Sequence, residues 1–167
     1  MSGSPHTGPA EGDEVTLTGT IEEYYNLTEL TSVSSGVVHG ASDEMIAPSL
    51  IPVIDMGEAY EGCLVAFGNV TVSNSDLGYG EWEFSNADGS ARVDDKWDYY
   101  YFPQEGHEIA YIEGVVDYSF SNYKLQPRLA RDVVEQGTTR IQRVQQVLYS
   151  DLMNCLLYTS PSPRDTM

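Results

Sequence analysis

The sequence predicts an all-β protein built around a small closed barrel of five strands. Apolar and polar residues alternate with a period of two along most of residues 12–136, which is typical of strands with one buried face. Clusters of Gly, Asn, Asp and Ser divide this alternation into short strands. Gly114 interrupts the longest run, at a point where a closed barrel needs a strand to bend sharply.

The five predicted strands follow one another within residues 58–136. Asn86-Ala87-Asp88-Gly89 predicts a tight hairpin between the second and third strands. Five short strands with a bent fourth strand fit the OB fold, a Greek-key barrel. The predicted strands are CLVAFGNVTV (63–72), GEWEFS (80–85), GSARVDD (89–95), HEIAYIEGVVDYSF (107–120) and NYKLQP (122–127).

An earlier part of the chain repeats the pattern of the closing strands. GDEVTLTGTIEEY (12–24) and GHEIAYIEGVVDY (106–118) share Gly-x-Glu, a short strand, a second glycine, an acidic residue and Tyr. We therefore predict that residues 12–40 are the C-terminal hairpin of an incomplete OB-like unit, whose first three strands would precede Met1. This remnant hairpin is expected to pack on the barrel or to remain loosely ordered.

The other segments are predicted to connect or extend these units. Residues 1–11 are interpreted as a truncated linker, and residues 41–57 as an extended linker, because Pro48 and Pro52 forbid a regular helix. Residues 137–154 would begin a following segment. The last residues differ: CLLYTSPSPRD, Cys155 to Asp165, resembles a translated sequencing adapter. Residues 155–167 are therefore predicted to be an artefact on a metagenomic fragment.

The charge of the chain restricts its partners. Eight Lys and Arg stand against 26 Asp and Glu, a formal net charge of −18. This excess argues against general nucleic-acid binding, in which basic side chains neutralise phosphates. It suits a secreted protein in a salty setting. No apolar run reaches the roughly 20 residues that span a bilayer, so no membrane partner is expected.

The motifs of the two repeated regions resemble a known family. GDEVTLTGTIEEYYNLTEL (12–30) resembles the OB-fold domains that accompany secreted bacterial nucleases. EGCLVAFGNVTV, YGEWEFSNADGSARVDD and GVVDYSFSNYKLQPR are similar to a following repeat in large extracellular proteins of Bacteroidetes-like bacteria. The resemblance covers roughly residues 10–135.

This resemblance implies a non-catalytic accessory module, located outside the cell or on its surface. Its partners would be other domains of the same polypeptide, such as an endonuclease/exonuclease/phosphatase domain, and the chain itself is expected to be a monomer. The residues agree with a non-enzyme, because His6, His39 and His107 are not spaced as ligands or as an acid–base pair. No cofactor is expected, apart from the calcium considered below.

Weak binding of single-stranded nucleic acid is the first alternative. Three basic residues fall within eight positions near the end of the barrel, and exposed aromatic rings could stack on bases beside them. Ordinary ion pairs with Asp117, Glu113 and Asp132 are the competing explanation for the basic residues. Tyr118, Phe120 and Leu125 are expected in the core. The candidate contacts are Lys124, Arg128, Arg131, Tyr123 and Tyr99.

A calcium-stabilised structural spacer is the second alternative. Asp94, Asp95 and Asp98 in VDDKWD could offer oxygen ligands to Ca²⁺. Lys96 lies among these acids, and no EF-hand spacing is present. A solvated acidic loop is the competing explanation.

Overall fold

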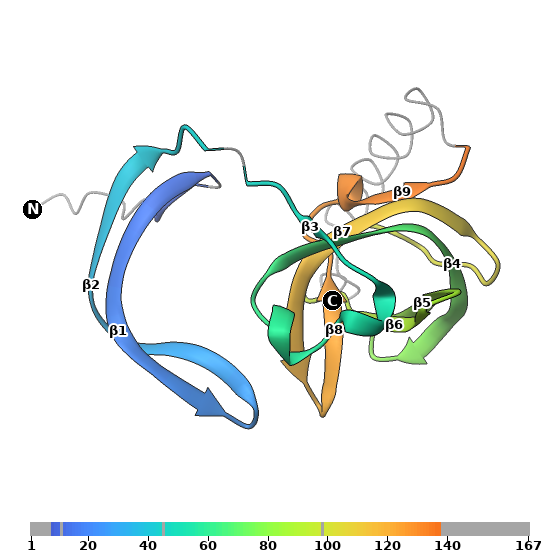
Figure 1. Ribbon diagram of the computed structural model, residues 1–167, viewed down its shortest axis with the longest axis horizontal. Helices are drawn as coiled ribbons and strands as arrows, with labels where there is room; N and C mark the ends of the chain where they lie inside the picture. Colours follow the sequence, from blue (N-terminus) through green and yellow to red (C-terminus); the bar gives the residue numbers. More distant parts are fainter. Residues whose placement is uncertain (1–7, 11, 45, 98, 138–167) are drawn as a thin grey trace, which may run out of the picture.

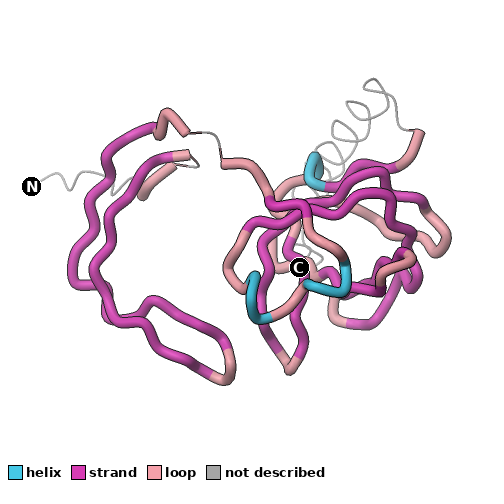
Figure 2. The backbone as a smooth tube through the Cα atoms, in the orientation of Figure 1, coloured by secondary structure: helices cyan, strands magenta, loops and turns pink. Residues whose placement is uncertain are grey.

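The computed structural model describes residues 8–10, 12–44, 46–97 and 99–137, and within them the protein is all-β, as predicted (Figures 1 and 2). A long hairpin precedes a seven-stranded sheet that curls into a barrel. In the described part of the chain, no helix is long and apolar enough to cross a membrane. Three short 3₁₀ turns, η1 (Val53–Asp55), η2 (Glu58–Tyr60) and η3 (Ala130–Asp132), accompany the strands.

The seven-stranded sheet contains a closed five-stranded OB-like barrel. Its strands are β4 (Leu64–Gly78), β5 (Glu81–Asn86), β6 (Gly89–Val93), β7 (Glu108–Ser119) and β8 (Asn122–Gln126). They neighbour one another in the order β4-β5-β6-β8-β7, and β7 pairs back with β4 to close the barrel. The β6–β8 contact is parallel and the others are antiparallel. This is the predicted Greek-key order.

Two short strands extend the barrel sheet at its edges. β3 (Ser49–Leu50) pairs in parallel with β4, and β9 (Val133–Glu135) pairs antiparallel with β7. The predicted linker 41–57 is therefore more than a connection. It supplies β3, and Val53 in η1 is buried in the barrel core.

Large side chains fill the barrel, as expected for a barrel too narrow to leave a channel. Leu125 belongs to this core as predicted, and Tyr118 is only partly buried. The prediction for Phe120 is wrong, because its side chain is 90% exposed. Ser119 pairs with Asn122, so Phe120 and Ser121 form the two-residue turn and lie outside the strand. The largest fully buried apolar side chains are Trp82, Phe67, Phe84, Ile109, Ile112 and Leu125.

Gly114 lies where the backbones of β7 and β8 come closest. A Cβ atom added at Gly114 would be 2.6 Å from the carbonyl oxygen of Gln126 and 2.8 Å from the nitrogen of Pro127. Real Cβ atoms do not approach backbone atoms so closely, so only glycine fits here without a shift of one strand. This contact gives a physical reason for a glycine at the position where the sequence predicts a bend.

Residues 12–40 form an antiparallel hairpin that stands beside the barrel in Figure 1. Its strands are β1 (Asp13–Tyr24) and β2 (Leu27–Ala41). Hydrogen bonds connect its turn region to the rest of the protein: Thr28 N–H, at the start of β2, donates to Glu61 Oε1 at 2.6 Å, and Asn26 Nδ2 in the turn lies 3.5 Å from Tyr118 Oη on β7. The predictions for residues 138–154 and 155–167, for Asp98 and for most of residues 1–11 concern positions outside the described residues.

The contact at Gly114 gives a stability test. We expect Gly114→Ala to destabilise the protein by roughly 1–3 kcal/mol, because the methyl group forces β7 and β8 apart. Gly68→Ala is the control, since its nearest atom outside the neighbouring residues is the Ala110 oxygen at an ordinary 3.8 Å. Its free energy of unfolding should change by less than about 0.5 kcal/mol. Urea denaturation of both variants checks this, and equal effects would contradict the close-contact explanation.

Candidate functional site

In OB folds, ligands bind across the second and third strands, between the loop joining strands one and two and the loop joining strands four and five. Here β5 and β6 are the second and third strands. The two loops are the turns around Tyr79 and around Phe120. We call this surface the ligand face; it has a buried floor and an exposed rim.

A buried lysine forms the floor of the ligand face. The Lys124 side chain is about 2% exposed, although alternation places it on the outer side of β8. Its Nζ lies 2.5 Å from Glu81 Oε1 and 3.0 Å from Asp94 Oδ2. Arg92 Nη1 donates to the other Glu81 oxygen at 2.7 Å. We call these four residues the ion-pair network; its two cations and two carboxylates balance each other.

The network shifts the pKa values of Glu81 and Lys124 toward their charged forms. Burial opposes the charge on Glu81, but hydrogen bonds from Lys124 and Arg92 lower the pKa of its carboxyl group below 4.5. Burial likewise opposes the charge on Lys124, but Glu81 and Asp94 raise the pKa of its ammonium group above 10.5. Both groups are therefore ionised at neutral pH, and each neutralises the other.

Two exposed aromatic rings form the rim. Tyr79 is 99% exposed and Phe120 is 90% exposed, and both have positive φ, 59° and 50°. Such backbone conformations are unusual for bulky residues and cluster at functional sites. The Lys124 ammonium lies 5.4 Å from the centre of the Phe120 ring. The rings border a cavity of about 540 Å³, the rim cavity, which is lined by Leu77, Tyr79, Glu81, Arg92, Phe120 and Asn122.

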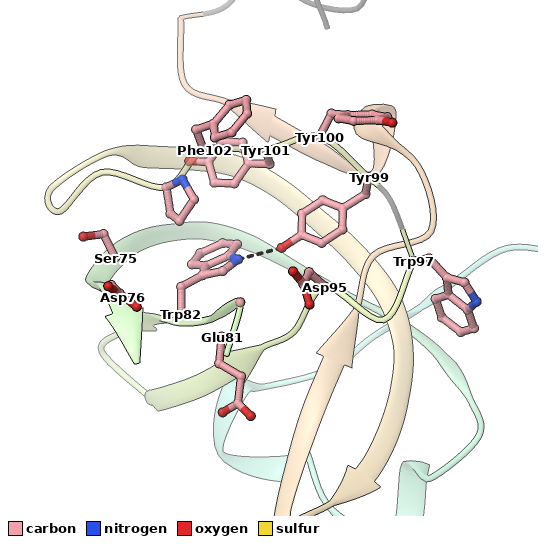
Figure 3. A pocket seen from close by; sticks show the side chains of 12 residues that line it. Ser75, Asp76, Glu81, Trp82, Asp95, Trp97, Tyr99, Tyr100, Tyr101 and Phe102 are labelled. Atoms are coloured by element: carbon pink, nitrogen blue, oxygen red, sulfur yellow. Dashed lines mark hydrogen bonds between the residues drawn. The ribbon is translucent and has the colours of Figure 1, made fainter. Parts of the chain in front are cut away.

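A second cavity of about 400 Å³, the aromatic cavity, lies beside the β4–β5 turn (Figure 3). Trp82 Nε1 donates to Tyr99 Oη at 2.7 Å, and the Trp82 and Tyr101 rings are 5.3 Å apart. Burial raises the pKa of the Tyr99 hydroxyl, so this group stays neutral. The described lining residues include no Lys or Arg, but Asp76, Glu81 and Asp95 are among them. The cavity therefore suits an uncharged or cationic group better than a phosphate.

The predicted nucleic-acid contacts have different surroundings in the structure. Lys124 and Tyr99 are buried, so neither side chain presents a free surface to a ligand. Tyr123 is partly buried; its hydroxyl donates to Glu58, and its ring lies 4.8 Å from that of Tyr118. Arg131 is exposed within η3. These side chains do not form one basic surface.

Arg128 has the structural role that competed with nucleic-acid contact. Its Nη2 lies 2.7 Å from Glu113 Oε1, and its Nε lies 3.1 Å from Asp132 Oδ2. Asp132 is fully buried and also accepts hydrogen bonds from the backbone N–H groups of Arg128 and Leu129. The predicted ion pairs with Glu113 and Asp132 are thus confirmed. Asp117 instead pairs with Lys96, at 3.0 Å.

Asp94 and Asp95, the two predicted calcium ligands in the described part of the chain, are not gathered into a metal site. Asp94 Oδ2 forms an ion pair with Lys124, and Asp94 Oδ1 accepts a hydrogen bond from the Asp95 N–H at 2.8 Å. The Asp95 carboxylate lies against Gly80, where an added Cβ would be 2.3 Å from it. Among the described residues, no group of three or more His, Cys, Asp and Glu could hold a metal ion.

Sequence reasoning missed Tyr79, the most exposed ring of the rim. Gly78-Tyr79-Gly80 contains the signal, because an aromatic residue between two glycines in a turn has no strand face to occupy. It also placed Phe120 in the core, by continuing the alternation of β7 one residue too far.

Comparison with known proteins finds no matching protein-family model, no matching curated protein and no matching solved structure. What the ligand face can do therefore follows from its geometry.

Lys124 offers the clearest test of the ion-pair network. We expect Lys124→Met to destabilise the protein by about 3 kcal/mol, because it leaves the Glu81 and Asp94 carboxylates without their shared cation. Lys96→Met is the control: its ion pair with Asp117 is half-exposed, so the loss should be less than about 1 kcal/mol. Urea denaturation measures both. Equal losses would show that Lys124 adds no more than a surface ion pair.

The lowered pKa of Glu81 predicts a pH dependence. A carboxyl whose pKa is lower in the folded state stabilises the fold above its unfolded pKa, and this contribution disappears as the pH falls through the folded pKa. The stability difference between the natural chain and Glu81→Gln should therefore be largest at neutral pH and shrink below about pH 4.5. Urea denaturation at about pH 7 and pH 3 measures it. The same difference at both pH values would contradict the assignment.

Proposed function

We propose that this chain is a non-catalytic OB-like module of a larger secreted bacterial protein, in which it positions or tethers a catalytic domain. An extracellular nuclease is the parent that the sequence resemblance implies. The partners are then other domains of the same polypeptide, and neither a membrane nor a cofactor is required.

The charge state of the ligand face is the observation that carries this proposal. A phosphate-binding surface needs Lys and Arg whose charge is available to the nucleic acid. On this face Lys124 is buried between Glu81 and Asp94, and Arg92 donates to Glu81. The chain as a whole carries a net charge of −18. A positioning role therefore agrees with the electrostatics better than phosphate binding does.

The way the chain leaves the barrel also supports a positioning role. After β8, Arg128 bridges Glu113 on β7 and the buried Asp132. Asp132 in turn holds the backbone of the segment before η3, and β9 then pairs with β7. The exit of the chain is thus tied to the barrel at several points, as a module that orients a following domain requires.

Binding of single-stranded nucleic acid is the second candidate, and the exposed rim favours it. Tyr79 and Phe120 lie on the loops that OB folds use for ligands, with Asn122 and Arg92 lining the same cavity. Stacking of a base on such a ring contributes roughly 1–3 kcal/mol even without a specific hydrogen bond. Stacking could therefore support weak binding, although the basic groups of this face are paired.

A fluorescence anisotropy titration separates the two candidates. With labelled oligo(dT) at low salt, the positioning role predicts no binding up to about 100 µM protein, because the face offers few cations to release counterions. Micromolar binding that weakens with salt would overturn it. If binding occurs, Tyr79→Ala with Phe120→Ala should abolish it. Tyr25→Ala, an exposed ring on the separate hairpin, is the control and should leave it unchanged.

A further inference from the structure

We infer that β1–β2 is the closing hairpin of a second OB-like unit, and that its apolar face docks a three-stranded sheet with basic side chains opposite Glu29. The pairing register is the first observation. Ile21 pairs with Leu30 as Val116 pairs with Leu125. All five pairs of β7–β8 recur in β1–β2 at a constant offset in residue number. This inference rests on the fold and is independent of the proposed function.

The turns of the two hairpins have the same backbone conformation. Tyr25 and Asn26 have φ values of 52° and 64°, and Phe120 and Ser121 have 50° and 65°. Each turn therefore places an exposed aromatic residue first, in a conformation that such residues seldom adopt. Two-residue hairpins commonly have this turn geometry, but they favour Asn, Asp or Gly at the first position, so the shared aromatic residue is the distinctive feature.

The tight glycine contact of the barrel also recurs. A Cβ atom added at Gly19 would be 2.8 Å from the Thr31 carbonyl oxygen. The corresponding distance from Gly114 to the Gln126 oxygen is 2.6 Å, and the two glycines occupy equivalent places in the common register. β1–β2 thus repeats the close backbone contact that β7–β8 makes at its glycine.

The side chains that such a barrel would bury lie open in the hairpin. Val116 and Leu125 are 1% and 0% exposed in the barrel, but their counterparts Ile21 and Leu30 are 68% and 41% exposed. In the barrel, β4 covers β7 in antiparallel pairing and β6 covers β8 in parallel pairing. The same arrangement would cover β1 and β2. Other apolar side chains left open are Val15, Leu17, Val33, Val37 and Val38.

One charge distinguishes the missing sheet from β4–β6. Glu29 occupies the place of Lys124, whose ammonium group lies between Glu81 and Asp94. Glu29 also pairs across the hairpin with Glu22, a like-charge pair that a neighbouring cation would relieve. A sheet with acids at the Glu81 and Asp94 positions would gather four carboxylates there. Complementarity therefore requires Lys or Arg at these positions.

The order of the strands indicates where this sheet comes from. In the barrel, β4, β5 and β6 precede β7 and β8 in the chain. The equivalent sheet is therefore a segment of the same polypeptide that precedes β1. A second copy of this chain is a poorer occupant, since its own β4–β6 sheet carries Glu81 and Asp94.

A chimera tests the inference. A copy of residues 61–107 carrying Glu81→Lys and Asp94→Lys is fused ahead of Gly8 through a flexible Gly/Ser linker. The matched control carries the same copy without substitutions. In the first chimera, we expect the backbone amides of Ile21 and Leu30 to exchange with solvent at least about tenfold more slowly than in the natural chain. In the control, the slowing of exchange should be clearly smaller. The fusion keeps the local concentration of the sheet high enough to detect weak docking.

Reversing the charge at Glu29 compares the two chimeras with each other, so the test works even where the copied core packs imperfectly. Introducing Glu29→Lys into both chimeras should invert the preference, so that the unsubstituted copy now protects the hairpin better. An unchanged preference, or no protection in any of the four proteins, would overturn the inference. Protection that rises with concentration in the natural chain would also overturn it, because a second copy would then be the occupant.

Discussion

The ammonium group of Lys124 joins three segments of the barrel through one buried ion-pair network. The parallel contact of β6 with β8 is the shortest strand pairing of the barrel and consists of only two residue pairs, Arg92 with Lys124 and Val93 with Leu125. The ion-pair network strengthens this short contact, because Glu81 comes from β5, Asp94 follows β6, and Lys124 belongs to β8. A buried charge is stable only with such partners. The outer surface is therefore tied together where the backbone pairing is shortest.

The same constraint determines what the surface can offer to a ligand. Lys124 forms ion pairs with Glu81 and Asp94, and Arg92 forms an ion pair with Glu81. The charges at the centre of the ligand face therefore balance. Recognition there would depend on ring faces and polar edges, and Tyr79 and Phe120 provide the rings. The basic side chains that could bind a phosphate on this face already form the ion pairs between the strands. They are therefore not available to a phosphate.

Much of the fold could be predicted from the sequence, because strand alternation and turn residues are local signals. The Asn86–Gly89 turn was placed correctly, and Gly114 lies at a close contact with the end of β8. The surroundings of Lys124 could not be predicted, since alternation says only that it faces outward. Its burial comes from Glu81 and Asp94, which lie 43 and 30 positions away in the chain. Tyr99 lies in a segment without periodicity, so no local pattern indicates that Trp82 holds it inside.

The acidic residue at Glu29 has a consequence for how tandem units of this kind assemble. Two hairpins with the same register, the same turn and the same bend would be interchangeable during folding, and exchanged elements are a characteristic failure of repeated domains. In the two-unit arrangement inferred above, the opposite charges of Glu29 and Lys124 would distinguish the two hairpins, because an exchange would bury a carboxylate among carboxylates. In that arrangement a single side chain would disfavour pairing with the wrong sheet during folding.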